Sequence, residues 1–397
     1  MGCVECKICH QNEEKNQFEY PQSTQQKEEE KININPEINN NIENKLNNTY
    51  SNINTNQAQN LHFHEEFEEK LKSIGKYISE EDFQKILLES EINFYQPNSP
   101  FPFINNNSFS HKMKPIEFEG GNIYEGEWDD NFVMDGHGKY FLIEEKVLAE
   151  GIWEKGELKK ARIFYPNGEF YEGEMNNSCY NGKGKLINEN KDIYEGEFLD
   201  GEKCGKGKIN YFNGDIYEGN FLKNKFHGYG ELTLENGLKY KGDFFSNFLE
   251  GKGILSFPPR ETYEGDFEKN LFHGKGVYTY SNGDEYDGEF EFGIRKGKGI
   301  YKQKDGITFE GNWENNVPNG AGKIFFDDKI IKCNYHNGKI MDKPVDEDGL
   351  YYNNIDYNFY CEKMNLLGQS IPYLENSEEN NEQYKAGTIL SFLEDDE

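Results

Sequence analysis

The chain has 397 residues, and its 73 acidic and 43 basic side chains give a formal net charge of −30. The mean hydropathy is −0.95, and no stretch approaches the roughly 20 apolar residues that a membrane-spanning helix needs. The excess of acids argues against nucleic-acid binding, because carboxylates repel phosphate. Only 35% of the residues are hydrophobic, yet 15% are aromatic and 41 are glycine. This balance excludes one large aliphatic core and favours a thin, glycine-spaced β structure held by aromatic rings, with disordered flanks.

The N-terminal region divides into three parts. Residues 1–60 are polar and rich in asparagine, so we expect disorder, because they cannot bury enough apolar surface to offset chain entropy. Over 61–91, apolar residues recur at helical spacing in two runs, and Ser79 with Asp82 forms a capping box before the second run. We therefore expect two short amphipathic helices, broken near Gly75, followed by a proline-containing linker over 92–116.

The first ten residues support three hypotheses. The run Cys6-Lys7-Ile8-Cys9-His10 has the spacing of c-type haem attachment, and with Cys3 it supplies zinc-ligand residue types. Haem attachment lacks an export signal here, and a zinc site lacks the second half of a zinc knuckle. Gly2 is placed for N-myristoylation after removal of Met1, and Cys3 and Cys6 are candidates for palmitoylation. One myristoyl chain binds membranes only weakly, so an acylated anchor needs the second chain; the alternative is an unmodified, cysteine-containing terminus.

The other cysteines are scattered, which favours free thiols in a reducing compartment rather than a disulfide framework. They are Cys179, Cys204, Cys333 and Cys361.

A repeat of 23 residues dominates the stretch from 117 to 343. A Tyr-Glu-Gly-acid-aromatic motif followed by Gly-x-Gly begins at Tyr124 and returns at constant spacing from Tyr171 onward. A degenerate copy begins at Ala149 and a partial copy at Ile331. The first aromatic position of the eight clear copies is occupied by Tyr124, Tyr171, Tyr194, Tyr217, Tyr240, Tyr263, Tyr286 and Phe309.

Each copy predicts two short antiparallel strands. The dipeptide Asn213-Gly214 predicts a type I′ hairpin turn. Tyr217, Gly219 and Phe221 then alternate onto one face of the following strand. Glycines leave room where rings from neighbouring strands lie flat. We therefore expect the tyrosines to stack in one ring ladder and the phenylalanines in another.

This pattern resembles the MORN repeat (membrane occupation and recognition nexus), over about 220 residues from Gly120 to Gly338. The resemblance implies an all-β fold, an elongated single-layer antiparallel sheet of stacked hairpins. Members of this family are found at membranes, in cytoskeletal assemblies and in ciliary structures, and some carry an enzyme domain beside the repeats. The flanks 1–116 and 344–397 contain no phosphate-binding loop, kinase motif set or nucleophile elbow. We expect no catalytic residues, no cofactor, no metal site and no small-molecule substrate.

Charged residues repeat in register with the motif: an acid follows the first aromatic residue, and a lysine lies between the paired glycines. We interpret both sets as cross-strand charge pairs on the face opposite the rings, because they follow the repeat rather than one locality. Three histidines are interpreted as turn residues that lie too far apart to share a metal ion. The acids are Glu125, Glu172, Glu195, Glu218, Glu264, Asp287 and Glu310, the lysines are Lys183, Lys206, Lys252, Lys275 and Lys298, and the histidines are His137, His227 and His273.

Two functions fit these observations. The first is a non-catalytic scaffold that binds protein partners along the repeat sheet and is tethered to the cytoplasmic face of a membrane by its acyl chains. The alternative is a ciliary or cytoskeletal assembly component, similar to those of radial-spoke heads, with no lipid role. Direct contact of the sheet with anionic lipid is not expected, because residues 117–343 carry 42 acids and 30 bases, a net of −12. The tail 344–397 is more acidic still, with a net charge of −11.

Overall fold

The computed structural model describes residues 74–90, 111–341 and 345–346, which contain 23 strands and one helix. This confirms the all-β fold class and the antiparallel sheet of successive hairpins. The chain forms two compact units that divide between Cys179 and Tyr180. The asparagine-rich region, the acylation candidates, the helix expected before Gly75 and the acidic tail beyond Asp346 lie outside the described residues.

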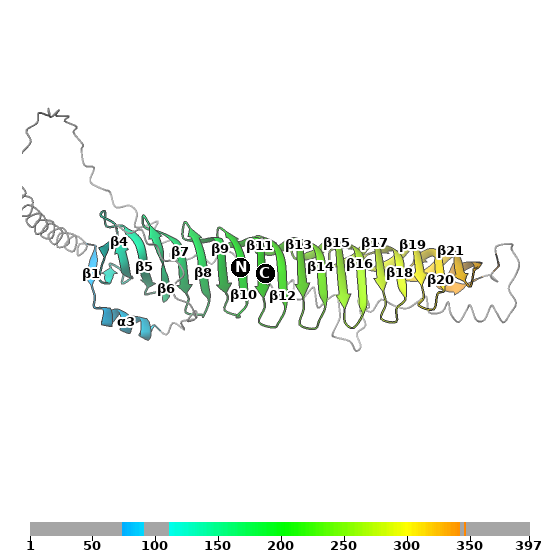
Figure 1. The fold of residues 1–397 in the computed structure, drawn as a ribbon, viewed down its shortest axis with the longest axis horizontal. Coiled ribbons are helices and arrows are strands. Elements are labelled where there is room, and N and C mark those ends of the chain that lie inside the picture. The colour runs from blue at the N-terminus through cyan, green and yellow to red at the C-terminus, as the bar shows by residue number, and fades with distance from the viewer. Residues whose placement is uncertain (1–73, 91–110, 342–344, 347–397) are drawn as a thin grey trace, which may run out of the picture. The chain divides into compact units, whose positions relative to one another are not determined.

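The first unit is built from one antiparallel series of strands (Figure 1). From β4 to β8, each strand pairs with the next strand along the chain. Its elements are β1 (Gly75–Tyr77), α3 (Glu80–Glu89), β2 (His111–Lys112), β3 (Ile116–Phe118), β4 (Ile123–Trp128), β5 (Met134–Leu142), β6 (Val147–Glu154), β7 (Glu157–Phe164) and β8 (Phe170–Asn176).

A short strand and the helix cap the start of this first series. The expected capping box is confirmed, because the Ser79 hydroxyl accepts a hydrogen bond of 3.0 Å from the Asp82 amide. Gly75, however, begins strand β1, which pairs with β3, and the side chain of Phe83 on α3 is fully buried. The stretch expected to be a linker enters the sheet from His111 onward, where β2 and then β3 pair with β4. The edge of β3 that does not pair with β4 is covered by β1. Stable sheets usually protect their edge strands in this way.

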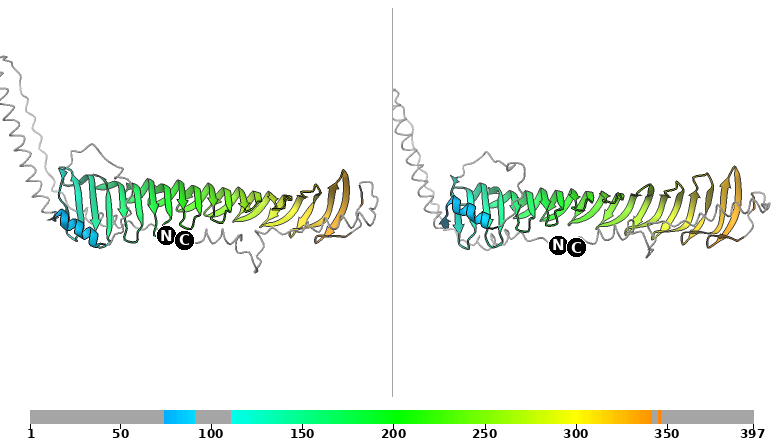
Figure 2. Two further views of the ribbon diagram at one scale, coloured as in Figure 1. Left: turned by 60° about the horizontal axis from the view of Figure 1, so that its bottom comes forward. Right: turned by 90° about the horizontal axis from the view of Figure 1, so that it is seen from below.

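The second unit repeats a single hairpin (Figure 1). Consecutive strands pair antiparallel from β9 to β23. Figure 2 shows the strand direction turning gradually along this unit, as the twist between paired strands requires. The strands are β9 (Cys179–Ile187), β10 (Ile193–Leu199), β11 (Glu202–Asn210), β12 (Ile216–Leu222), β13 (Lys225–Thr233), β14 (Lys239–Phe245), β15 (Phe248–Phe257), β16 (Glu261–Glu268), β17 (Leu271–Thr279), β18 (Glu285–Glu291), β19 (Ile294–Lys302), β20 (Thr308–Glu314), β21 (Val317–Phe326), β22 (Lys329–His336) and β23 (Lys339–Ile340).

The expected type I′ turn at Asn213-Gly214 is wrong. Only Gly214 has a positive φ there, of 98°. The Gly214 amide donates to the Tyr211 carbonyl at 3.0 Å, and the Tyr211 amide donates to the Asp215 carbonyl at 2.9 Å. This is the three-residue loop in which a type I turn is followed by a left-handed glycine. The type I′ geometry belongs instead to the other turn of the hairpin, Lys223-Asn224, where φ is 51° and 65°.

These two-residue turns connect neighbouring repeats through an asparagine. The Asn224 side-chain oxygen accepts a hydrogen bond from the Lys203 amide at 2.8 Å, 21 residues earlier in the chain. The same bond recurs in three later repeats, from Phe226 to Asn247, from Leu249 to Asn270 and from Arg295 to Asn316. At the opposite edge, the Asp215 carboxylate accepts from the Glu235 amide at 2.7 Å. Both edges of the second unit are thus held in register by side chains that reach one repeat away.

Candidate protein-binding surface of the repeat sheet

A row of paired glycines crosses the second unit. Each strand from β9 to β21 contributes one glycine, and each glycine pairs with those of its neighbouring strands. A Cβ atom placed on Gly219 would lie 2.5 Å from the Tyr217 hydroxyl oxygen and 2.6 Å from the Gly230 Cα. The tyrosine ring therefore lies flat over the two glycines of its own hairpin. We call this side of the sheet the ring face and the opposite side the open face.

The aromatic side chains of the ring face form one interleaved ladder. The Tyr217 ring contacts Phe221 of its own repeat edge-on, at 5.1 Å between centroids, and Phe244 of the next repeat at 5.2 Å. The same alternation continues to the contact between Phe309 and Tyr335 at 5.2 Å. The expectation of two separate ladders is therefore wrong, because the ladder tyrosines of the second unit each join an aromatic ring of their own repeat to one of the next, which is Trp313 in the case of Tyr286. The ladder positions Tyr194, Tyr217, Tyr240, Tyr263, Tyr286 and Phe309 lie in the second unit, and Tyr124 and Tyr171 are buried in the first.

The tyrosine hydroxyls of the ladder donate hydrogen bonds to backbone carbonyls. The hydroxyl of Tyr240 donates to the Asp243 carbonyl at 2.9 Å, and six other ladder tyrosines make the same bond to the residue three positions on. Burial raises the pKa of the Tyr240 phenol far above its ordinary value. The phenol consequently stays protonated as a donor, and it has no role as a general base at neutral pH.

We expect the variant Tyr240→Phe to be folded and about 0.5–1.5 kcal/mol less stable, the usual net contribution of one hydrogen bond. The ring would stay in place over its glycines, and only the bond to Asp243 would be lost. Phe309 holds the same position without a hydroxyl, and its ring still lies over Gly311 and Gly322. Urea unfolding of both proteins measures the difference. A loss of several kcal/mol would contradict this account of the hydroxyl.

Two departures from the ladder are compensated locally. In the degenerate copy, Ala149 leaves the ring position without an aromatic side chain, and Leu158 approaches Gly151 instead. In the second unit, Arg295 is fully buried on the ring face. Its guanidinium donates to the Tyr280 hydroxyl at 2.8 Å and to the Asn316 carbonyl at 2.6 Å, and it lies 4.7 Å from the Trp313 ring centroid. The sequence pattern did not single out Arg295, because an isolated arginine carries no periodic signal.

Cross-strand ion pairs on the open face follow a register that differs from the expected one. Glu195 lies 2.8 Å from Lys185, which follows the second glycine of its strand rather than lying between the two glycines. Glu218 makes the equivalent pair with Lys208 at 3.4 Å. The lysines between the glycines lie opposite the second acid of the motif instead, as Lys252 pairs with Asp266.

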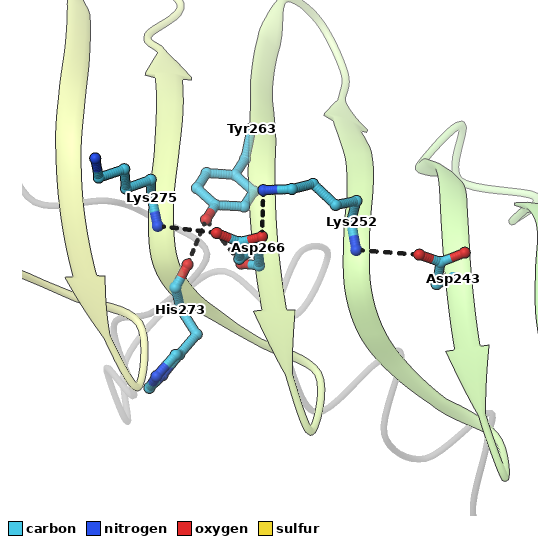
Figure 3. A network of polar contacts seen from close by, with 6 residues as sticks. All are labelled: Asp243, Lys252, Tyr263, Asp266, His273 and Lys275. Carbon is cyan, nitrogen blue, oxygen red and sulfur yellow. Dashed lines mark hydrogen bonds and ion pairs between the residues drawn. The ribbon is translucent and has the colours of Figure 1, made fainter.

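This second acid has a structural role at a bulge (Figure 3). The Asp266 carboxylate accepts a hydrogen bond of 3.1 Å from the Lys275 amide, while the Tyr263 hydroxyl contacts the carbonyls of Asp266 and His273. Partial burial acts to raise the pKa of Asp266, but the bonds from Lys252 and Lys275 outweigh it and lower that pKa. A register shift next to Gly265 turns this carboxylate toward the adjoining strand.

The three histidines lie in strands, so their interpretation as turn residues is wrong. His137 is in β5, His227 in β13 and His273 in β17. The His273 ring nitrogen lies 3.3 Å from the Glu268 carboxylate. Within 74–90, 111–341 and 345–346, no group of three or more His, Cys, Asp or Glu side chains is placed to hold a metal ion. In the same ranges, no helix is long and apolar enough to cross a membrane.

Apolar side chains on the open face were missed by sequence reasoning. At the end of the first strand of three successive hairpins, Leu199, Leu222 and Phe245 are 57%, 50% and 59% exposed. Ile254 is 40% exposed, and Val277 and Ile300 occupy the equivalent position in the next two repeats. The 23-residue spacing of both sets was the signal that could have found them.

Comparison with known proteins supports the repeat assignment. The sequence model of the MORN repeat matches this chain at residues 124–141, 194–216, 217–239, 240–260, 263–285, 286–308 and 309–329. No curated protein sequence matches the chain.

Similar solved structures include the wild-type TCP10 domain of Danio rerio CPAP, at 9% identity and a TM-score of 0.28, covering 58% of this chain and 98% of that one. The TCP10c domain of Drosophila melanogaster Sas-4 is 17% identical with a TM-score of 0.21, covering 42% and 93%. A catalytically inactive virginiamycin B lyase from Staphylococcus aureus is 12% identical with a TM-score of 0.13, covering 60% and 86%. Likeness at this level carries no argument about partners. The seven family matches between residues 124 and 329 show that the chain belongs to the MORN repeat family.

Proposed function

We propose that this MORN repeat chain is a non-catalytic scaffold that binds protein partners along the open face of its sheet. The observation that carries the proposal is the difference in burial between the two faces of the sheet. The side chains of the ring face pack against one another and leave little surface for a partner, since Tyr217, Tyr263 and their counterparts are fully buried. The open face presents charged and apolar side chains at the same positions in repeat after repeat, which is how repeat proteins build extended binding surfaces.

Photo-crosslinking tests this assignment. A photoreactive amino acid at Glu218, on the open face, is expected to capture the partner proteins in a cell extract. The same group at Asn282, in a loop at the edge of the sheet, serves as the matched control. Equal labelling from both positions, or none from either, would contradict partner binding through the open face.

We further propose that Gly2 carries a myristoyl group and that Cys3 and Cys6 carry palmitoyl groups, which hold the scaffold on the cytoplasmic face of a membrane. Electrostatics supports acyl chains over direct lipid contact, because the net charge of −12 over 117–343 repels anionic headgroups. Each buried methylene of an acyl chain contributes about 0.8 kcal/mol, which two chains convert into stable attachment.

The double variant Gly2→Ala with Cys3→Ser is therefore expected to move entirely to the soluble fraction, at low and at high salt. The control variant Cys204→Ser, which changes a thiol in β11, is expected to fractionate as the unchanged protein does. Intact-mass analysis of the native protein detects the acyl groups directly. Membrane pelleting that survives the double substitution would exclude acylation as the anchor. Pelleting of both proteins with detergent-insoluble cytoskeleton would favour the ciliary or cytoskeletal alternative.

A further inference from the structure

One row of side chains on the open face changes its chemistry along the second unit. We call it the acid row, because it contains the residue that follows the first aromatic residue of each repeat, which is an acid in every clear copy except at Lys241. In β9 to β12 it holds the ion pairs of Lys185 with Glu195 and of Lys208 with Glu218. Further along, Glu231 of β13 pairs with Lys241 of β14. Up to this point, cross-strand lysines neutralise the acids.

From β15 to β19 the lysines of the acid row are replaced by aliphatic residues. Strand pairing sets Ile254 opposite Glu264, Glu264 opposite Val277, Val277 opposite Asp287, and Asp287 opposite Ile300. The result is a row of five residues that alternates between apolar and acidic, which we call the alternating row. It consists of Ile254, Glu264, Val277, Asp287 and Ile300.

The two acids of the alternating row have no lysine opposite them in the strand pairing, although the charge of Lys302 acts on Asp287. Glu195 and Glu218 each have a lysine nitrogen within ion-pair distance, whereas Glu264 and Asp287 are exposed and form no ion pair with any described residue. Four residues of the row, all but Ile300, line a hollow of about 470 Å³ together with glycines of the glycine row. Lys241, Lys252 and Lys275 line the same hollow, and the first two are held in ion pairs with Glu231 and Asp266. Ile254 is exposed, and Val277 and Ile300 are half-buried. Apolar side chains that reach the solvent beside carboxylates without an ion pair fit a surface that is covered by a partner.

We propose that the alternating row binds a basic amphipathic α-helix of a partner protein, laid across the strands. This rests on the scaffold function proposed above and names its partner's chemistry. Paired strands are about 4.8 Å apart, so the five side chains span about 19 Å, with like residues about 9.6 Å apart. An α-helix rises about 1.5 Å per residue, so side chains seven residues apart on one stripe are about 10.5 Å apart. A residue three or four positions after each of them lies about midway between them on the same stripe. The helix presents an apolar residue, then Lys or Arg three or four residues later, and repeats this every seven residues.

The periodicity and the charge select this occupant. An extended β-strand shows side chains to one face about every 6.6 Å, which matches neither spacing of the row. An anionic membrane surface is repelled by the net charge of residues 117–343. Single metal ions would gain little, because the two acids are two strands apart. A cationic helix is also drawn to the net charge of −12 over residues 117–343, which speeds its association.

Binding of a designed peptide to the full chain tests the proposal. The probe is a 15-residue peptide with Leu at positions 1, 8 and 15, Arg at positions 4 and 11, and alanine and glutamine elsewhere. We expect saturable binding with a rise in peptide helicity by circular dichroism. A peptide of the same composition, with both arginines moved to the opposite helix face, is expected to bind about tenfold or more weakly, a difference of about 1.4 kcal/mol. Equal affinity of the two peptides, binding without helix formation, or binding by neither peptide would overturn the proposal.

Substitutions that copy the protein's own chemistry provide the matched variants. The triple variant Ile254→Lys, Val277→Lys and Ile300→Lys rebuilds the ion pairs of the earlier repeats, so we expect it to fold and to lose binding at least about tenfold. Lys208→Ile, outside the alternating row, is expected to leave the affinity unchanged. If the triple variant does not fold, Glu264→Gln with Asp287→Gln keeps the side-chain shapes and is expected to reduce the affinity similarly. Unchanged affinity in a folded variant would overturn the proposal.

Crosslinked partners from a cell extract separate this proposal from the scaffold function. Partners that are captured by the native chain and lost from the triple variant support both. Partners captured equally by the two proteins overturn the helix site and leave the scaffold function intact. Capture by neither protein overturns the scaffold function itself.

Discussion

The variant Gly219→Val is expected to lose at least about 1–3 kcal/mol of stability, the usual cost of forcing extra atoms into a packed site. Even the first added carbon meets the Tyr217 hydroxyl oxygen at 2.5 Å and the backbone of Gly230 at 2.6 Å. The backbone cannot yield without breaking the pairing of β12 with β13, so the ring must leave its place between Phe221 and Phe244. The midpoint of urea unfolding measures the loss.

The neighbouring variant Glu218→Val is the matched control for this experiment. It places the same valine side chain on the open face of the same strand. Only the exposed ion pair of Glu218 with Lys208 is lost there. We expect a change within about 0.5 kcal/mol, as for most surface substitutions. If Gly219→Val unfolded at the same urea concentration as this control, the flat packing of Tyr217 over the glycine row would be refuted.

The strands and their facing residues could be predicted from the sequence because the repeat supplies many copies of one pattern. Alternation in a single copy, from Tyr217 through Gly219 to Phe221, is weak, but a constant spacing of 23 residues restates it in every hairpin. The interleaving of the rings could not be predicted, because it depends on how far Tyr217 reaches toward Phe244 across two strands. That reach is a property of packing, which the period leaves open.

The turns show where a local signal is ambiguous. Asn-Gly is typical both of two-residue type I′ turns and, through its glycine, of a type I turn followed by a left-handed residue. Only the paired register of the flanking strands decides between them, and at Asn213-Gly214 it leaves three residues in the loop. The true type I′ turn at Lys223-Asn224 has no glycine, so its asparagine carries the whole signal.

The open face was harder to predict because the 23-residue spacing does not specify which residues of neighbouring strands lie opposite one another. Sequence spacing treats Lys252 and Glu264 as members of one cross-strand set, whereas pairing sets Lys252 opposite Asp266 and Ile254 opposite Glu264. The consequence is functional. Once the true neighbours are known, the acids that lack a lysine opposite them stand out from those that have one. A three-residue strand such as Gly75–Tyr77 is undetectable for a related reason, since it is too short to show alternation.

The second large effect is expected at the turns, from Asn270→Ala. Asn270 is fully buried, its φ is 67°, and its side-chain oxygen accepts a hydrogen bond from the Leu249 amide at 2.6 Å. Alanine leaves that buried amide without its acceptor and also places a Cβ in a left-handed conformation. The two effects together are expected to lower the stability by about 2–4 kcal/mol, measured by urea unfolding.

The variant Asn270→Gly separates the two contributions. Glycine adopts a positive φ without strain, so only the hydrogen bond to Leu249 is lost, and we expect this variant to be about 1–2 kcal/mol more stable than Asn270→Ala. The chain itself supplies the precedent, because Gly293 holds the same position one repeat later with a φ of 81°, and its amide still donates to the Phe272 carbonyl at 2.8 Å. Equal stability of the alanine and glycine variants would mean that backbone strain contributes nothing at this turn. Full stability of both would mean that the asparagine does not hold neighbouring repeats in register.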